Sequence, residues 1–206
     1  MAISLESLLP AGRVAFVLCE VQESVIGDGA PWPALTEAAK RVNLIGNAAR
    51  VAEAARARGA PVIHCTAEGL PNRFGSNTNT RLSGNARKRR AGDADPSLAK
   101  PVAAVWRDGD ILLPRYHGTS CMTGGPLDSL LRNYGATTLI ISGVSLSFAM
   151  LNLTFDATNR SYQVILPRDA AAGFPEDYAE QVLANTLSML ATVTTTDEVL
   201  AAWPQG

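Results

Sequence analysis

Residues 137–170, TTLIISGVSLSFAMLNLTFDATNRSYQVILPRDA, have the pattern of a strand, a helix and a second strand. Residues 137–144 form a continuous apolar and β-branched run, which is typical of a strand covered on both faces, and Gly143 allows a sharp turn after it. Apolar residues return at 162–166. The side chains between the two runs that recur at helical spacing are Phe148, Leu151, Phe155 and Thr158. Two buried strands joined by a crossover helix predict a parallel pair with a right-handed connection.

The rest of the chain repeats this alternation. Further strands are predicted at 14–21, 61–65, 111–113 and 192–194, which brings the number to about six. Helices are predicted from Pro33 to Gly59, over 126–133 with a stop at Gly135, over 178–190, and after a capping box at Thr195 and Glu198. Residues 68–101 are polar and poorly periodic, so a long loop is predicted there. This order predicts a doubly wound, three-layer α/β architecture, with residues 1–206 as a single domain.

Composition places the chain among ordinary globular proteins and gives no sign of a polyanionic partner. The 206 residues are 47% hydrophobic and 18% charged, with a net charge of −1, which argues against nucleic acid or an anionic membrane as a partner. The dense basic run at 87–90 is interpreted as a solvated loop. The first residues lack the pattern of a secretory signal, and no apolar stretch is long enough for a membrane span, so we expect a cytoplasmic protein.

The inventory of metal ligands and cofactor motifs is small. Cys19, Cys65 and Cys121 are odd in number and far apart in sequence, which fits reduced thiols better than a disulfide framework. The two histidines, His64 and His117, are too few and too far apart for a zinc or iron site. No glycine-rich fingerprint follows the first predicted strand, so neither a nucleotide cofactor nor a metal is expected.

Polar side chains follow several of the predicted strands. They are Glu20 and Gln22 after the first strand, Arg115 and His117 after the third, residues 145–149 after the fourth and Asp169 after the fifth. Because the carboxyl ends of parallel strands meet at one edge, these positions are expected to converge. An acid, a guanidinium and the start of a helix together suit a small anion. Asp169 is expected to tie the end of its strand to a neighbouring loop.

Three segments carry a resemblance to a known family: FVLCEVQ at 16–22, LLPRYHG at 112–118 and GVSLSFAMLNLTFDATNRSYQVILPRDA at 143–170. They resemble the isochorismatase-like, or cysteine hydrolase, superfamily over nearly the whole domain. The resemblance implies a Rossmann-like α/β/α sandwich with a mainly parallel sheet, and a homodimer or homotetramer. It also implies a cis peptide between Val144 and Ser145, an oxyanion pocket of backbone N–H groups near the helix start and, in most members, a triad of aspartate, lysine and cysteine.

By this resemblance the chain is a divergent member with a non-canonical triad. Glu20 stands where the aspartate is expected, Arg115 where the lysine is and Ala149 where the cysteine is. A methyl group cannot attack a carbonyl, so amidase chemistry through position 149 is disfavoured. Natural divergence is preferred as the origin of Ala149, because three positions differ together, with engineered replacement of a cysteine as the alternative. Cys121 and Cys65 are weaker substitutes for the nucleophile, and buried apolar filling is the preferred reading of both.

Isochorismatases proper, a minority of the superfamily, hydrolyse a vinyl ether without a thiol, using a carboxylic acid to protonate the substrate and water to complete the reaction. Transferred to this chain, Glu20 is the general acid or base and Arg115 holds the carboxylate of the substrate. An arginine beside Glu20 would lower the pKa of that carboxyl, whereas a general acid needs a proton. We therefore expect a bound anion to occupy Arg115 and to raise the pKa of Glu20 only when substrate is present.

Six further residues are predicted to contact the substrate: Gln22, His117, Ser145, Ser147, Phe148 and Asn152. For Ser145 and Ser147 a turn or capping hydroxyl is preferred over a nucleophile, because neither has an evident histidine base. Polar residues of the long loop would close over the ligand or simply face solvent: Arg73, Asn77, Asn79 and Arg81.

Two classes of function remain open from the residues. The preferred one is a thiol-independent hydrolase acting on a small, carboxylated molecule. The other is a catalytically inactive relative that binds a metabolite or a protein partner. An amidohydrolase whose nucleophile was replaced is a third reading.

Overall fold

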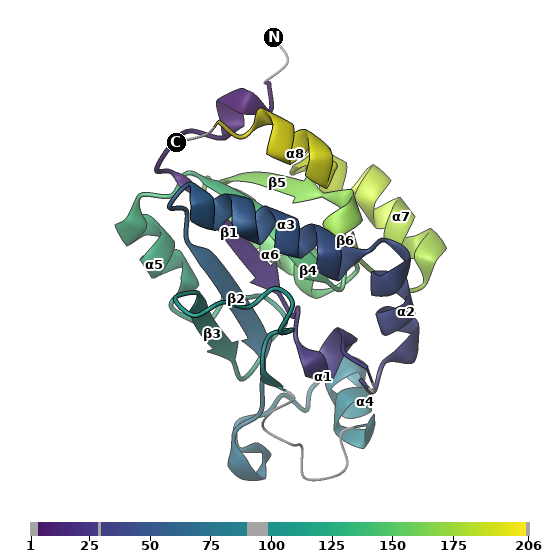
Figure 1. Cartoon of the computed structure of the whole chain (residues 1–206). Helices are drawn as coiled ribbons and strands as arrows, with labels where there is room; N and C mark the ends of the chain where they lie inside the picture. Colours follow the sequence, from purple (N-terminus) through teal and green to yellow (C-terminus); the bar gives the residue numbers. More distant parts are fainter. Residues whose placement is uncertain (1–3, 29, 90–98, 205–206) are drawn as a thin grey trace.

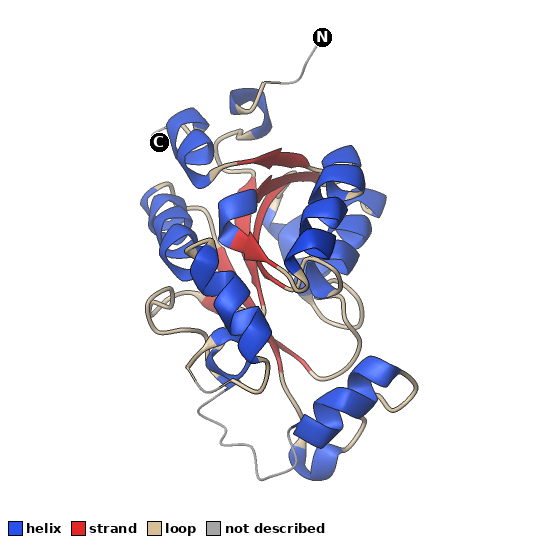
Figure 2. Ribbon diagram, turned by 90° about the vertical axis from the view of Figure 1, so that its right-hand side faces the viewer, coloured by secondary structure: helices blue, strands red, loops and turns tan. Residues whose placement is uncertain are grey.

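The computed structural model describes residues 4–28, 30–89 and 99–204. A mainly parallel sheet forms the middle layer, with helices on both sides of it (Figure 2). The strand order is β3-β2-β1-β4-β5-β7, and the short β6 pairs with β4. The strands are β1 (Val14–Cys19), β2 (Val62–Ala67), β3 (Ile111–Arg115), β4 (Thr138–Val144), β5 (Gln163–Pro167), β6 (Ala171–Ala172) and β7 (Thr192–Thr194). The predicted α/β fold is confirmed, with one short strand more than the six expected.

The helices connect successive strands (Figure 1). They are α1 (Glu23–Ile26), α2 (Pro33–Arg41), α3 (Leu44–Ala57), α4 (Arg81–Arg89), α5 (Leu127–Tyr134), α6 (Ala149–Asn159), α7 (Glu176–Asn185) and α8 (Thr196–Ala202). Short 3-10 turns lie at η1 (Glu6–Leu8), η2 (Pro71–Arg73), η4 (Arg168–Ala170) and η5 (Leu187–Met189). Within the described residues, no helix combines the length and apolar character needed to cross a membrane.

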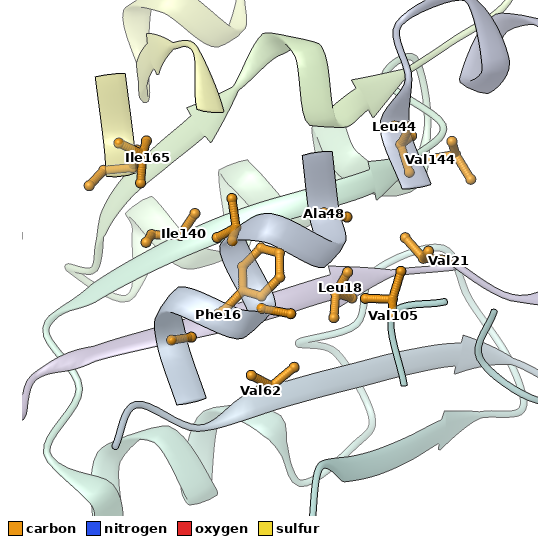
Figure 3. Close-up of a cluster of buried hydrophobic side chains, with 14 of the residues drawn as sticks. Phe16, Leu18, Val21, Leu44, Ala48, Val62, Val105, Ile140, Val144 and Ile165 are labelled. Carbon is orange, nitrogen blue, oxygen red and sulfur yellow. The ribbon is translucent and has the colours of Figure 1, made fainter. Parts of the chain in front are cut away.

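The central strands β1 and β4 are buried along their whole length, as their continuous apolar sequences predict. Alternate residues of β1 enter two cores. Phe16 and Leu18 pack with Ile140 and with Leu44 and Ala48 of α3 on one face (Figure 3). On the other face Val17 and Cys19 join a cluster that includes residues of α5 and α6. Two helical layers around one sheet fix the positions at which the strands end.

Two predictions about helices were wrong. The helix expected from Pro33 to Gly59 is divided into α2 and α3 at Asn43, which adopts the left-handed conformation with φ of 52°. Asparagine tolerates this conformation, and the apolar pattern continues because both helices face the same core. The helix expected over 178–190 ends earlier: α7 stops at Asn185, and the turn η5 follows it.

The polar segment expected as a loop also contains a helix, α4. Its start carries a local signal, since the hydroxyl of Thr80 accepts a hydrogen bond from the N–H of Ser83 at 3.1 Å and the hydroxyl of Ser83 accepts one from the N–H of Thr80 at 3.2 Å. The backbone of residues 87–89, part of the basic run, belongs to this helix and not to a loop. The solvation predicted for those side chains, and all of residues 90–98, lie outside what the structure describes.

Candidate functional site

The ends of β1 and β3 hold an acid and a guanidinium on either side of β2. Glu20 follows β1 directly and adopts the left-handed conformation with φ of 56°, while its N–H donates to the carbonyl of Cys65 at 2.9 Å. Arg115 is the last residue of β3. Its Nη2 atom donates to Oε1 of Glu20, so the two side chains join across the end of β2. The predicted meeting of these residues at one sheet edge is confirmed.

The ion pair is shielded from solvent. The side chain of Glu20 is 18% exposed and that of Arg115 is 12% exposed. A second guanidinium nitrogen, Nη1, donates to the carbonyl of Gly118. Burial alone would lower the pKa of Arg115, but the carboxylate of Glu20 and the nearby thiols raise it above its ordinary value. Arg115 is therefore a permanent positive charge at this edge of the sheet.

The turn between β4 and α6 packs directly against the end of β1. Gly143 has φ of 127°, and a Cβ atom at this position would lie 2.0 Å from the carbonyl oxygen of Cys19, so only glycine fits. The peptide between Val144 and Ser145 is cis, as the resemblance implied. Ala149 begins α6, is 4% exposed and belongs to the same buried cluster as Cys19. The position of the expected nucleophile therefore lies in the buried cluster that β1 shares with α6.

Ser145 and Ser147 face each other within this turn. Their hydroxyl oxygens lie 3.1 Å apart. The carbonyl of Ser145 accepts hydrogen bonds from the N–H groups of Phe148 and Met150, at 3.0 and 3.1 Å. Of the two roles predicted for Ser147, the turn hydroxyl is confirmed and the helix cap is not, because Phe148 precedes the helix and no side chain caps it. Phe148 itself is 49% exposed.

Three thiols lie together next to the ion pair. This cluster was not predicted from the sequence. Cys19 and Cys65 stand opposite each other in the register of β1 and β2, and the Sγ atoms of Cys19 and Cys121 lie 3.3 Å apart. All three are free and buried, as expected for reduced thiols. Hydrogen bonds from the thiols of Cys19 and Cys65, with the charge of Arg115, hold the pKa of Cys121 well below its ordinary value, although burial opposes this. The same hydrogen bonds, together with burial, raise the pKa of Cys19 and of Cys65.

A small pocket opens beside these groups. Residues that line it include Cys65, Arg115, His117 and Cys121. His117 is exposed, and its ring lies against Gly124, where a Cβ atom would come within 2.5 Å of Cε1. The pocket thus brings a guanidinium, an imidazole and a thiol to one small space.

The loop of residues 116–126 that forms one wall of this pocket is held by helix α6. Asp156 accepts hydrogen bonds from the hydroxyls of Ser120 and Thr123, the latter at 2.8 Å. Burial would raise the pKa of Asp156, but these hydrogen bonds lower it below its ordinary value. Asn152 was predicted to contact substrate, and its amide donates to the hydroxyl of Thr119 at 2.9 Å. Both residues of α6 therefore position the loop.

Two other predicted residues bond backbone groups and do not line the pocket. Asn77 accepts a hydrogen bond from the N–H of Gly118 at 3.1 Å, which joins the long polar segment to the loop of residues 116–126. Gln22 is fully buried, and its amide bonds the N–H and the carbonyl of Ala67 at 2.6 and 3.0 Å. It therefore holds the ends of β1 and β2 together.

Asp169 has the structural role predicted for it. Its carboxylate accepts hydrogen bonds from the N–H and the hydroxyl of Thr196, at 2.8 and 2.9 Å, and so ties the end of β5 to the start of α8. The reciprocal capping box of Thr195 and Glu198 is also present.

Glu20 of the candidate site is bonded to Arg115. In the part of the chain that the structure describes, no group of three or more His, Cys, Asp or Glu side chains is arranged to hold a metal ion.

A parallel sheet flanked by helices defines an α/β protein, and the acid and the cation lie at its carboxyl edge, where such sheets generally bind their ligands. The isochorismatase domain model matches residues 14–198, and the chain belongs to this family of hydrolases.

Relatives and solved structures agree with this assignment. The chain is 28% identical over 163 residues to a probable isochorismatase of Pseudomonas chlororaphis, covering 79% of this chain and 76% of that protein. It is 31% identical over 159 residues to ureidoacrylate amidohydrolase RutB of Methylobacterium radiotolerans, covering 69% of this chain and 60% of that protein. An isochorismatase family protein from Burkholderia thailandensis has a similar fold, with a TM-score of 0.76, 21% identity, and coverage of 93% of this chain and 96% of that one.

Proposed function

We propose that this protein is a thiol-independent, isochorismatase-like hydrolase that acts on a small carboxylated metabolite. Glu20 is the general acid or base, Arg115 binds the carboxylate, and the turn that leads into Ala149 supplies backbone N–H groups to a developing negative charge. The observation that carries the proposal is the shielded ion pair of Glu20 and Arg115 at the strand ends. Arg115 also lines the pocket, so the pair is coupled to a space that a ligand can enter.

The present partners of Arg115 are ones that a substrate carboxylate can replace. One guanidinium nitrogen bonds Glu20 and another bonds a backbone carbonyl, that of Gly118. A carboxylate is a stronger acceptor than a neutral carbonyl and can accept two parallel hydrogen bonds from a guanidinium. Arg115 would therefore lose its hydrogen bond to the carbonyl of Gly118, and part of its contact with Glu20, and would bond the substrate carboxylate instead.

This exchange supplies a proton to the reaction. A substrate carboxylate beside Glu20 adds a like charge while it weakens the contact with Arg115, and both changes raise the pKa of Glu20. Glu20 then takes up a proton on binding and delivers it to the carbon of the vinyl ether. Water adds to the resulting oxocarbenium ion and loses a proton, and the hemiketal then breaks its ether C–O bond to give a carbonyl compound and an alcohol. Binding and protonation are linked by the same arginine.

The pocket thiol supports a second candidate function. Cys121 lines the pocket, and its thiolate is favoured by Arg115 and by two neighbouring thiols. It would serve as the nucleophile of an amidohydrolase in place of a cysteine at position 149, in line with the amidohydrolase among the relatives.

Turnover measurements on four proteins separate these candidates. Wild type, Glu20→Gln, Arg115→Ala and Cys121→Ala are assayed with isochorismate and with simple amides. The preferred function predicts vinyl ether hydrolysis that Glu20→Gln abolishes and Cys121→Ala retains. Amide hydrolysis that requires Cys121 would establish the second candidate. If all four proteins are inactive but wild type binds small carboxylates through Arg115, the protein is a binding descendant of the family.

Linked proton uptake tests the mechanism directly. Calorimetric binding of a small carboxylate in buffers of different ionisation enthalpy should show proton uptake by wild type and none by Glu20→Gln. Binding without uptake by wild type would rule out the linkage.

A further inference from the structure

The three thiols beside the ion pair form an arrangement that the proposed hydrolysis does not use. Cys19 ends β1, Cys65 lies opposite it in β2, and Cys121 comes from the loop after β3. Cys19 and Cys121 are 102 positions apart in sequence, yet their Sγ atoms are separated by 3.3 Å. Both are reduced and buried.

The two sulfur atoms differ in access and in charge. Cys121 and Cys65 line the pocket and Cys19 does not belong to that lining, so a small molecule entering the pocket meets Cys121 before Cys19. Cys121 is also the thiol whose anionic form Arg115 and its neighbours stabilise, whereas Cys19 retains its proton. A thiolate, and not a thiol, is the form that reacts with a peroxide. Cys121 is therefore the reactive member, and Cys19 is placed to respond to it.

The chain around the two residues permits a bond between them. A disulfide requires an S–S distance of about 2.05 Å, so the sulfur atoms must approach from their present 3.3 Å. Cys19 is fixed, because β1 is paired with both β2 and β4 at this point. Cys121 lies in the loop of residues 116–126, outside the sheet, so a bond to Cys19 requires this loop to shift against the side-chain contacts that α6 makes with it.

We propose that Cys19 and Cys121 form a peroxide-responsive thiol pair next to the active site. The thiolate of Cys121 attacks one oxygen of a peroxide, the O–O bond breaks, and hydroxide or an alkoxide leaves. Cys121 becomes a sulfenic acid. The thiol of Cys19 then attacks the sulfur of Cys121, a disulfide forms and water leaves. The two sulfur atoms lose two electrons in total, and the peroxide gains them.

The disulfide would act on the site through the chain. Cys19 directly precedes Glu20, and the loop of Cys121 also contains Gly118, whose carbonyl accepts from Arg115. Oxidation removes the negative charge of Cys121 from beside Arg115 and draws the loop towards β1. Formation of the bond does not depend on which reaction the site catalyses.

Mass spectrometry of the full-length protein tests the proposal. Reduced wild type is treated with hydrogen peroxide, and intact mass and non-reducing peptide maps are recorded. We expect the loss of two hydrogen masses and a peptide pair linked through Cys19 and Cys121. In Cys19→Ala we expect a sulfenic acid on Cys121 that dimedone traps. Cys65→Ala is the matched control, because it removes the third thiol of the same cluster and should still form the linked pair.

Several results would overturn the pair. Wild type that keeps both thiols under peroxide would do so, as would a disulfide that contains Cys65, or a dimedone adduct on Cys19 instead of Cys121. If the alanine variants do not fold, brief peroxide treatment of wild type with dimedone present gives the same answer, since the adduct must appear on Cys121 before the disulfide does. A failed result leaves the proposed hydrolase untouched, because neither thiol takes part in the chemistry of Glu20.

Discussion

Two pairs of arginine and carboxylate lie at opposite ends of β3, and they differ in what surrounds them. Asp110 directly precedes the strand and pairs with Arg56 of α3, whereas Arg115 ends the strand and pairs with Glu20. Both pairs join a guanidinium to a carboxylate, so the charges are the same. The first is closed by protein groups, whereas Arg115 of the second lines the pocket. The groups that surround each pair, and not the charges within it, distinguish a structural ion pair from a candidate binding site.

The partners of each pair show this difference in detail. Arg56 donates to both carboxylate oxygens of Asp110, at 2.9 and 2.7 Å, and also to the carbonyl of Val105 at 2.7 Å. Asp110 further accepts from the N–H of Arg107 at 3.0 Å and contacts Nε2 of His64 at 3.0 Å. Its side chain is 4% exposed. Such a pair positions the loop before β3 and has no acceptor left for a ligand.

Arg115 makes a less complete set of bonds. The Nη2 atom bonds Glu20, and the buried Nε atom has no hydrogen-bond partner within the described part of the chain. Glu20 meanwhile sits in a backbone conformation that few residues other than glycine adopt. An incompletely bonded cation beside a strained acid is the pattern expected of a binding site.

Asp110→Ala should have the largest effect, and on stability. It leaves the guanidinium of Arg56 and the imidazole of His64 without their shared acceptor, so we expect the free energy of unfolding to fall by about 3–5 kcal/mol. Urea denaturation followed by circular dichroism measures the change. Asp197→Ala is the control, because its pair with Arg50 is exposed and should contribute little. Equal losses of stability in both variants would show that the buried pair contributes no more than the exposed one.

Glu20→Gln should lower activity strongly and stability little, the opposite of what we expect for Asp110→Ala. Glutamine still accepts a hydrogen bond from Arg115 but cannot deliver a proton, so we expect turnover of a vinyl ether substrate to fall at least about 10²-fold. The urea midpoint should stay close to that of wild type. Glu68→Gln makes the same change near the end of β2 and should keep its activity. A large loss of stability with normal turnover in Glu20→Gln would make this pair structural as well.

Arg115→Lys should have a smaller effect that is confined to binding. Lysine keeps the charge but loses the planar fork that holds a carboxylate with two hydrogen bonds. We expect KM to rise about tenfold, which corresponds to about 1.4 kcal/mol, with kcat changed less. Steady-state kinetics on both proteins measures the two constants. A fall in kcat alone would place Arg115 in the chemical step instead.

The pH dependence of stability should give the smallest effect. It concerns His64, which is hydrogen-bonded to Asp110 of the buried pair. Burial lowers the pKa of His64 below its ordinary 6.5, although the hydrogen bond to Asp110 acts in the opposite direction. The unfolded chain therefore binds a proton more readily than the folded one, and stability should decline as the pH falls below about 6.5. Urea midpoints between about pH 7 and pH 5 measure this, because the carboxyl of Asp110 has a lowered pKa and titrates further down.

His64→Gln is the matched variant for this pH series. Its stability should show a flatter dependence over the same range, since glutamine has no proton to bind. The activity profile should not change in parallel, because His64 does not line the pocket and its side chain lies on the other face of β2 from that of Cys65. A slope that is identical in wild type and His64→Gln would assign the titration to another group.

Much of the fold was predictable because its signals are local. Strands that are buried on both faces appear as unbroken apolar runs, and the chain direction then places Glu20 and Arg115 at one edge. The division at Asn43 was not predictable in this way, because the apolar pattern crosses it without a change in period. The cluster of thiols was missed for another reason: Cys121 comes from a loop whose path depends on Asp156 and Asn152.

The amino-acid sequence alone determined the order of the six predicted strands, the left-handed stop at Gly135, the capping box of α8 and the edge at which the polar residues collect. Each of these depends on neighbouring residues or on the direction of parallel strands. Only the tertiary structure decided that Arg115 bonds Glu20, that Gln22 is occupied by the backbone of β2, and that three distant cysteines meet. Those contacts depend on how side chains from separate strands and loops fill a shared space, and no local pattern in the sequence encodes that packing.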